Sequence, residues 1–144
     1  MTKGKIITNN NEIRDILENS KKIAVLGISF KKERDSYIVS NYLIEKGYEI
    51  IPVRPGGGKI FGLKVHENLD SIHEKIDILD VFRSSEHVTG HIEEALRLKP
   101  KVFWMQLGVK NQEAAKILTE NGIDVIMDRC IKIEHKRLCG QYNK

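Results

Sequence analysis

Residues 27–36 bring a glycine, hydroxyl groups and cations together in one short loop, and this combination suits the binding of phosphate groups. Gly27 permits a tight turn, two serines offer hydroxyl donors, and three cations supply positive charge. The loop leads into a predicted helix from about Ser36, and the free N–H groups at a helix N-terminus attract anions. The candidate phosphate-binding residues are Gly27, Ser29, Lys31, Lys32, Arg34 and Ser36.

The loop matches neither of the two common glycine motifs of nucleotide-binding proteins. Ser29 stands where the Gly-x-Gly-x-x-Gly fingerprint needs its second glycine, which disfavours ordinary NAD binding. No Gly-Lys-Ser or Gly-Lys-Thr opens the following helix, so the usual NTPase interpretation is also disfavoured. Arg54 follows the second predicted strand, where NAD-binding domains carry an acidic residue, and it suits a phosphorylated ribose. These features predict a ligand with several phosphates, one of them on a ribose.

The elements that must position these residues alternate as they do in α/β proteins. Short β-rich runs are separated by longer amphipathic stretches, a pattern typical of a parallel sheet covered by helices. A helix is predicted at residues 9–20, where Asn9 and Glu12 form a capping-box variant. Pro52 lies inside the second strand, and its missing N–H indicates a strand that ends early or lies near the sheet edge. The predicted strands, numbered in chain order, are residues 22–26, 49–53, 76–82, 102–105 and 123–127.

We expect these elements to form a three-layer α/β/α sandwich around a doubly wound parallel sheet, with strand order 3-2-1-4-5. Ligands of such open sheets bind beyond the carboxyl ends of the strands. Cations and hydrogen-bond donors follow each predicted strand, and the fold would bring them to one edge. They include Ser29, Arg54, Arg83, Gln106, Gly108, Arg129 and Lys132.

Length and composition exclude several other classes of protein. The chain has 144 residues, with 24 Lys or Arg against 20 Asp or Glu, so the formal net charge is +4. This length fits one domain, residues 1–144, and no apolar run approaches the ~20 residues of a membrane-spanning helix. The polar start of the chain does not resemble a secretory signal, and two cysteines are too few for a disulfide scaffold. We therefore expect a soluble, cytoplasmic protein without a membrane partner.

Five sequence blocks resemble the signature blocks of the small stand-alone CoA-binding proteins, which are similar in turn to the CoA-binding domain of succinyl-CoA synthetase. The resemblance runs from about residue 20 to 138 and implies a Rossmann-like fold that binds coenzyme A, a 3′-phosphorylated ADP with a pantetheine arm. Arg54 stands where the family often has Asn, and the three glycines at 56–58 are unusual. The blocks are Gly27-Ile28-Ser29 with Arg34-x-Ser36, Ile51-Pro52-Val53-Arg54-Pro55, Asp80-Val81-Phe82-Arg83, Trp104-Met105-Gln106-Leu107-Gly108 and Met127-Asp128-Arg129-Cys130-Ile131-Lys132-Ile133-Glu134-His135.

The resemblance implies a role for each matching residue. In the first loop, the glycine, the serines and the arginine would hold the pyrophosphate, and the two lysines could neutralise the remaining phosphate. The end of the second strand would flank the adenosine, the end of the third would line the crevice, and the end of the fourth would border the pantetheine path. These further residues are Val53, Arg54, Pro55, Phe82, Arg83, Gln106 and Gly108, with Lys132 after the fifth strand as an additional candidate.

The last block leaves alternatives open. Cys130 could act as a nucleophile, accept an acyl group or form a mixed disulfide with the CoA thiol, or it could be a small buried thiol. Cys130, His135 and Cys139 lack the paired cysteines of a zinc site, and Glu134–His135 could be an acid–base pair or a solvated pair at a helix end. No catalytic or metal-binding constellation emerges.

The predicted function is therefore a non-catalytic module that binds CoA or acyl-CoA. We expect it to be a monomer or weak homodimer, and an unidentified protein partner is possible. Nucleic acid is not expected as a partner, because no aromatic stacking platform accompanies the cations. The alternatives are an NADP-dependent reductase and a subunit of an acyl-CoA ligase.

Overall fold

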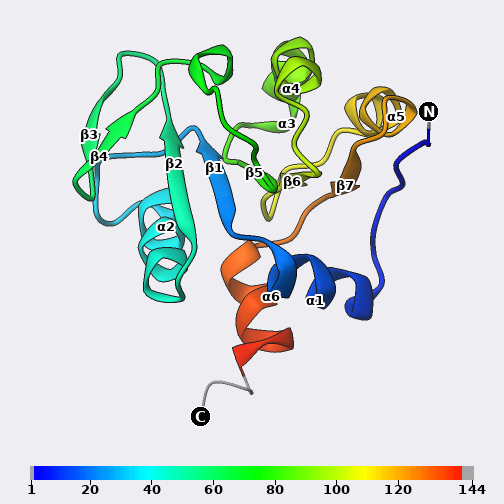
Figure 1. Cartoon of the computed structure of the whole chain (residues 1–144), viewed down its shortest axis with the longest axis horizontal. Coiled ribbons are helices and arrows are strands. Elements are labelled where there is room, and N and C mark those ends of the chain that lie inside the picture. The colour runs from blue at the N-terminus through cyan, green and yellow to red at the C-terminus, as the bar shows by residue number, and fades with distance from the viewer. Residues whose placement is uncertain (1, 141–144) are drawn as a thin grey trace.

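The central sheet consists of five parallel strands in the spatial order β2-β1-β5-β6-β7. The structure is a computed structural model, and it describes residues 2–140. Residues 1 and 141–144 of the expected domain lie outside the described part. The doubly wound α/β architecture predicted from the sequence is confirmed (Figure 1). The strands are β1 Lys22–Leu26, β2 Glu49–Val53, β5 Ile78–Val81, β6 Val102–Met105 and β7 Asp124–Ile126.

The predicted strand order was wrong in one position. The third core strand, β5, pairs with β1 and β6, so the order in chain numbering is 2-1-3-4-5 and not 3-2-1-4-5. Right-handed crossovers explain the difference. Helix α2, Asp35–Glu45, joins β1 to β2 across one face of the sheet, whereas the connection from β2 to β5 packs on the opposite face. A right-handed crossover on the opposite face moves the chain in the opposite direction, so β5 lies on the other side of β1.

Strand β2 lies at the edge of the five-stranded sheet, as Pro52 predicts. The segment after β2 forms a small antiparallel hairpin of β3, Gly58–Ile60, and β4, Leu63–Val65. Backbone bonds beside Pro52 hold this hairpin near the edge: the N–H of His66 donates to the carbonyl of Pro52, and the N–H of Arg54 donates to the carbonyl of His66. The edge is therefore partly covered, close to where the candidate site begins.

Helices cover both faces of the sheet and bury two apolar clusters against it. In Figure 1, α1, α2 and α6 lie below the sheet and α3, α4 and α5 lie above it. The predicted cap at Asn9 is confirmed, because its side-chain oxygen accepts N–H donors from the first turn of α1, and the side-chain oxygen of Asn111 caps α5 in the same way. The remaining elements are α1 Asn10–Asn19, α3 Ser85–Val88, α4 Ile92–Leu98, α5 Gln112–Glu120 and α6 Ile131–Leu138, with 3₁₀ turns η1 Leu69–Ser71 and η2 Thr89–His91.

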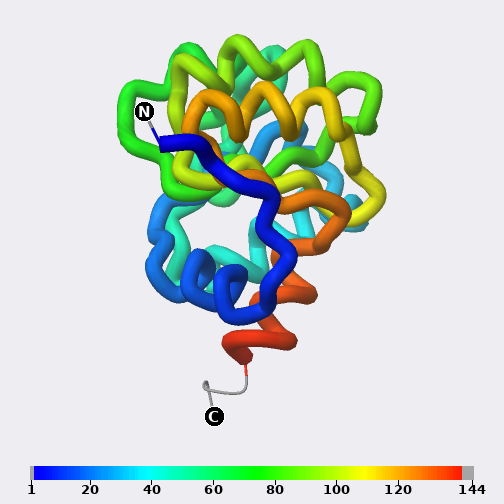
Figure 2. Tube along the Cα trace, turned by 90° about the vertical axis from the view of Figure 1, so that its right-hand side faces the viewer, coloured from blue at the N-terminus to red at the C-terminus, as the bar shows by residue number. Residues whose placement is uncertain are grey.

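The segment before α1 runs along the sheet edge beside β7, as Figure 2 shows. The N–H of Ile7 donates to the carbonyl of Val125, and the N–H of Val125 donates to the carbonyl of Lys5. Ile6 therefore pairs with Val125 as a short parallel extension of the sheet. This pairing brings the N-terminal segment next to the turn between β7 and α6.

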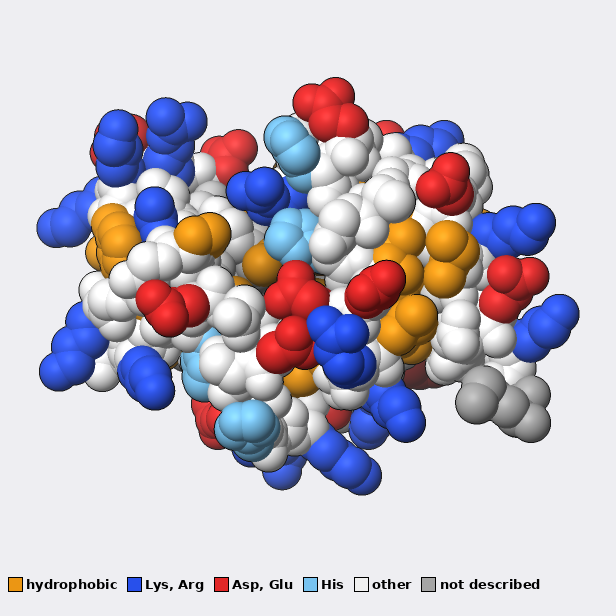
Figure 3. Space-filling view, turned by 90° about the horizontal axis from the view of Figure 1, so that it is seen from above, with side chains coloured by type: hydrophobic (Ala, Val, Ile, Leu, Met, Phe, Trp, Pro, Cys, Tyr) orange, Lys and Arg blue, Asp and Glu red, His pale blue; other side chains and the backbone are white. Residues whose placement is uncertain are grey.

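The surface above the sheet mixes charges of both signs. Figure 3 shows Lys and Arg side chains around this face with Asp and Glu side chains among them. No helix among residues 2–140 combines the length and the apolar character that a membrane span requires.

Candidate functional site

Two contiguous cavities lie along the carboxyl ends of the parallel strands. The phosphate-side cavity, about 580 Å³, is lined by the loop after β1, the start of α2 and the end of β2. The arm-side cavity, about 550 Å³, is lined by α2, the ends of β5 and β6, and the start of α6. Asp35, Phe82 and Arg83 line both cavities, which therefore form one groove.

The loop after β1 is fixed to the strands and to α2 by its own backbone. Gly27 has φ +89°, and a Cβ at this position would lie 2.6 Å from the carbonyl oxygen of Phe82, so only glycine fits between the strand ends. Its N–H donates to the carbonyl of Val53 at 2.9 Å. Further along, the N–H of Ser29 donates to Oγ of Ser36 at 2.9 Å, which ties the loop to the first turn of α2.

The phosphate-side cavity is positively charged. Its lining contains four cations and one carboxylate: Lys31, Arg34, Arg54, Arg83 and Asp35. Its wall also includes the N-terminus of α2, where Arg34 occupies the N-cap position without a capping side-chain bond. This arrangement suits an anion, since both the side chains and the helix end favour negative charge.

Two arginines of this cavity are held in place differently. Nη1 of Arg54 donates to the carbonyl of Ile28 at 3.2 Å, and its guanidinium lies over the ring of Phe30. Nε of Arg83 is buried and bonds to no atom of the described residues. A buried donor without an acceptor is costly, so the guanidinium of Arg83 lacks one stabilising contact beside the groove.

The arm-side cavity has more apolar walls. Ile38 and Val39 of α2 face Leu107 and Val109 after β6 across it. Gln106 is only 4% exposed, and its Oε1 accepts the N–H of Ile131, so the amide anchors the start of α6 at this wall. The apolar part of this lining suits an uncharged part of a ligand, and Asp35, Arg83 and Lys132 are the charged residues around it.

Twelve of the fourteen predicted site residues line these two cavities. Val53 does not, because its side chain is fully buried in the core and only its carbonyl takes part, as acceptor for the loop. Lys32 does not either; it lines a neighbouring cavity over α2, together with Lys46 and Lys136, that shares Ile38 and Lys132 with the arm-side cavity. The twelve are Gly27, Ser29, Lys31, Arg34, Ser36, Arg54, Pro55, Phe82, Arg83, Gln106, Gly108 and Lys132.

Several lining residues were not predicted from the sequence. Phe30, Ile38, Leu107 and Ile133 are large apolar side chains at the groove with 39% to 63% of their surface exposed. An aromatic residue between Ser29 and a run of charged residues was the available signal for Phe30. The other three carried no separate signal, because their exposure depends on helix and loop orientation.

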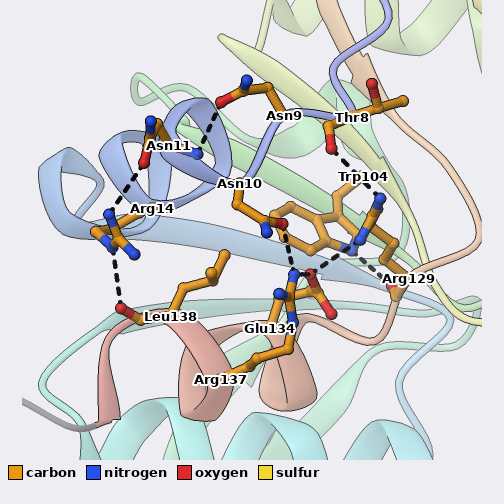
Figure 4. Close-up of polar contacts among 10 residues, drawn as sticks. All are labelled: Thr8, Asn9, Asn10, Asn11, Arg14, Trp104, Arg129, Glu134, Arg137 and Leu138. Carbon is orange, nitrogen blue, oxygen red and sulfur yellow. Dashed lines mark hydrogen bonds and ion pairs between the residues drawn. The ribbon is translucent and has the colours of Figure 1, made fainter.

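Glu134 and His135 do not form an acid–base pair. The carboxylate of Glu134 accepts from Arg129 at 3.1 Å and from Arg137 at 2.6 Å, as Figure 4 shows. Nδ1 of His135 lies 2.7 Å from the hydroxyl of Tyr42 on the other side of α6. Burial, aided by nearby Lys46, lowers the pKa of His135. The described residues contain no cluster of three His, Cys, Asp or Glu side chains that could hold a metal ion.

The fold is that of a doubly wound α/β protein whose groove lies at the carboxyl ends of the five parallel strands, the edge at which open parallel sheets bind their ligands. Residues 21–136 match the family model described as a CoA binding domain. The chain therefore belongs to the CoA-binding domain family, as its sequence blocks predicted.

Similar proteins cover nearly the same length of chain. The protein YneT of Bacillus subtilis (strain 168), described as uncharacterized, is 47% identical over 124 residues, which cover 86% of this chain and 92% of YneT. A structure titled cell-free ID.343 from Thermus thermophilus superposes with a TM-score of 0.88 at 41% identity, covering 91% of this chain and 99% of that one. A hypothetical protein from Pyrococcus horikoshii OT3 gives 0.87 at 36% identity, covering 96% and 99%.

Proposed function

We propose that the protein binds coenzyme A along this groove, with the phosphates in the phosphate-side cavity and the pantetheine arm in the arm-side cavity, and performs no chemistry on it. One observation carries the proposal: a cavity lined by four cations opens directly into one with more apolar walls. Coenzyme A has the same order of chemistry, with charged phosphates at one end and a neutral arm at the other. Membership of the CoA-binding domain family supports the same ligand.

The phosphates would meet three kinds of donor. Lys31 and Arg34 supply positive charge from the loop, the first N–H groups of α2 point along the helix axis, and Nε of Arg83 is a buried donor in need of an acceptor. Arg54 extends from the end of β2 and would reach the phosphorylated ribose. The arm would then pass Phe82 toward Gln106 and Gly108.

We propose a protein without catalytic activity because the polar side chains at the groove do not form a complete catalytic group. Ser84 lines the arm-side cavity, and its hydroxyl bonds Nδ1 of His87. Both side chains are exposed, and no described carboxylate bonds the other ring nitrogen of His87, so the pair lacks the third group that orients a catalytic base. Thioester hydrolysis is the second candidate function that this pair would serve.

The alternatives are less well supported by the loop after β1. An NADP-dependent reductase needs a close backbone approach to the pyrophosphate at the position of Ser29, whose Oγ accepts the N–H of Lys31. The ligase alternative needs catalytic groups on other domains, which a CoA-binding domain would have to meet as a partner.

Calorimetric titration with CoA, dephospho-CoA, NADP and NAD, under reducing conditions, tests the proposal. We expect CoA to bind most tightly and dephospho-CoA about tenfold more weakly, because one charge-assisted contact contributes about 1.5 kcal/mol. Tighter binding of NADP than of CoA would overturn the assignment. A separate incubation with acetyl-CoA, followed by chromatographic detection of released CoA, distinguishes binding from thioester hydrolysis.

Arg34→Ala tests the phosphate-side cavity with Arg97→Ala as the matched control. Arg97 pairs with Asp70 on an exposed surface and lines neither cavity of the groove. We expect Arg34→Ala to weaken CoA binding about tenfold with an unchanged free energy of unfolding, and Arg97→Ala to leave binding unchanged. Equal affinities for the two variants would show that the loop is not the phosphate site.

A further inference from the structure

A third cavity of about 430 Å³ continues the groove beyond the arm-side cavity. It shares Leu107, Cys130 and Ile133 with the arm-side cavity and no residue with the phosphate-side cavity. Its outer wall is the N-terminal segment that pairs with β7, including Ile6. The three cavities therefore follow one another in a line from the loop after β1 to the N-terminal segment.

Exposed apolar side chains mark the whole length of this line. Every large hydrophobic side chain that is exposed among residues 2–140 lines at least one of the three cavities. Monomeric proteins seldom gather exposed apolar groups in one place without a ligand or partner to cover them. The side chains are Ile6, Phe30, Ile38, Leu107 and Ile133.

The charged groups of the third cavity are largely occupied by contacts within the protein. Arg129 donates to Glu134 and to the carbonyl of Thr8, and Arg137 completes the pairing of Glu134 (Figure 4). Oδ1 of Asp128 accepts the N–H of Gly108 at 2.7 Å. These contacts leave the apolar side chains of Ile6, Leu107 and Ile133 free at the cavity wall, with Lys110 and Gln112 among its remaining polar side chains.

We infer that the third cavity takes the acyl chain of an acyl-CoA with an uncharged acyl group. The inference rests on the proposed function, because the order of the cavities then matches the order of the ligand: phosphates, pantetheine arm, thioester, chain. The thioester would lie near Cys130, where the second and third cavities meet. The chain would cover Ile6, Leu107 and Ile133, which are otherwise 44%, 63% and 51% exposed.

A chain-length series tests the inference. The affinities of CoA and of its acetyl, butanoyl, hexanoyl and octanoyl thioesters are measured by calorimetry at concentrations below micelle formation. Each methylene group that is buried can raise the affinity by at most about fourfold. We expect a progressive gain along the series that levels off when the cavity is filled.

Ile6→Gln and Ile6→Val are the paired variants for this series. Ile6 lines only the third cavity, and its role in the fold is a backbone pairing that either substitution retains. We expect Ile6→Gln to reduce the gain per methylene severalfold while CoA itself binds as before, and Ile6→Val to keep most of the gain.

The outcomes separate the inference from the proposed function. If CoA binds and the thioesters bind no more tightly, the acyl site is overturned and the CoA site stands. If CoA does not bind, the proposed function fails and the inference fails with it. A preference for succinyl-CoA over butanoyl-CoA would overturn an uncharged acyl group, because Lys110 at the cavity wall would then select a carboxylate.

Discussion

The guanidinium carbon of Arg54 lies 4.6 Å from the centre of the Phe30 ring. The same ring lies against Gly58, where a Cβ would come within 3.0 Å of it. The aromatic ring is thus placed between the end of β2 and the start of β3, and it holds the arginine at the wall of the phosphate-side cavity. Of the three unusual glycines at 56–58, Gly58 thereby acquires a structural role, since a side chain there would press against the Phe30 ring.

Phe30→Ala should weaken CoA binding because the arginine loses the ring that fixes its position; a loss equal to the ~0.5–2 kcal/mol of a stacked cation and ring corresponds to about two- to thirtyfold. The free energy of unfolding should also fall by about the 0.5–2 kcal/mol of the lost stack, and the 42% exposure of the Phe30 side chain limits any further loss. Phe30→Tyr keeps the ring and serves as the control. Calorimetry on both variants checks this, and wild-type affinity in Phe30→Ala would refute the role of the stack.

Lys31 and Lys32 are neighbours in sequence but line different cavities. Lys31 lies at the phosphate-side cavity, and Lys32 lies over α2 near Lys46. Lys31→Ala should weaken CoA binding several-fold and reduce its dependence on salt, because screening acts on charges that meet the ligand. Lys32→Ala should alter both quantities much less. Titrations of both variants with CoA at two salt concentrations distinguish the two lysines. A larger effect of Lys32→Ala would indicate that the phosphates bind over α2 and not in the phosphate-side cavity.

Gly27→Ala and Gly47→Ala separate backbone strain from steric overlap. Both glycines have a positive φ, +89° and +96°, so alanine at either position costs about 1 kcal/mol or more. A Cβ at Gly47 meets nothing within 4 Å, whereas at Gly27 it meets the carbonyl of Phe82. We expect Gly27→Ala to reduce the free energy of unfolding distinctly more than Gly47→Ala and also to weaken CoA binding. Urea denaturation measures the free energy of unfolding of both variants. Equal losses of this free energy would show that the strand ends adjust to the added methyl group at Gly27.

His135 should make stability depend on pH. Burial lowers its pKa in the folded protein below the value of about 6.5 that the unfolded chain has. Between these two pKa values the unfolded chain binds more protons, so the free energy of unfolding falls as pH drops below about 6.5, and the contribution is constant above about 7.5. His135→Gln should therefore lose less thermal stability than wild type between pH 7.5 and 5.5. Thermal unfolding scans of both proteins at pH 7.5 and 5.5 test this, because the other histidines are common to both proteins and cancel in the comparison. An equal loss of thermal stability in the two proteins would count against the role of His135.

The sequence predicted what local chemistry determines and missed what depends on how elements pack. The loop after β1, Arg54 and Gln106 were placed at the groove because strand ends of a parallel sheet share one edge. The strand order was missed because the connection from β2 to β5, which contains the β3–β4 hairpin and η1, carries no sequence signal for the face on which it crosses. The side chain of Val53 points into the core because the last residue of a strand still alternates between faces. Ile6 could not be associated with the site, since its position comes from pairing with β7, 119 residues further along the chain.

Cys130 should report occupancy of the junction between the second and third cavities. It is partly exposed and lines both cavities, whereas Cys139 is buried, and burial raises the pKa of its thiol. In a Cys139→Ser protein, saturating acetyl-CoA should slow alkylation of Cys130 by iodoacetamide about tenfold or more, because the pantetheine arm and thioester would cover the sulfur. Acetyl-CoA is preferred to CoA since it has no thiol to consume the reagent.

The matched Cys130→Ser protein leaves Cys139 as the reacting thiol. Its alkylation should be slower than that of Cys130 in the free protein, because a thiol with a raised pKa carries less thiolate, and it should not respond to the ligand. Mass spectrometry of the acetyl-CoA samples also shows whether an acetyl group moves to Cys130, as a nucleophilic cysteine would require. If acetyl-CoA binds at saturation and Cys130 is alkylated at its free rate, the pantetheine arm does not reach this junction, and the order of phosphates, arm and thioester along the groove is wrong.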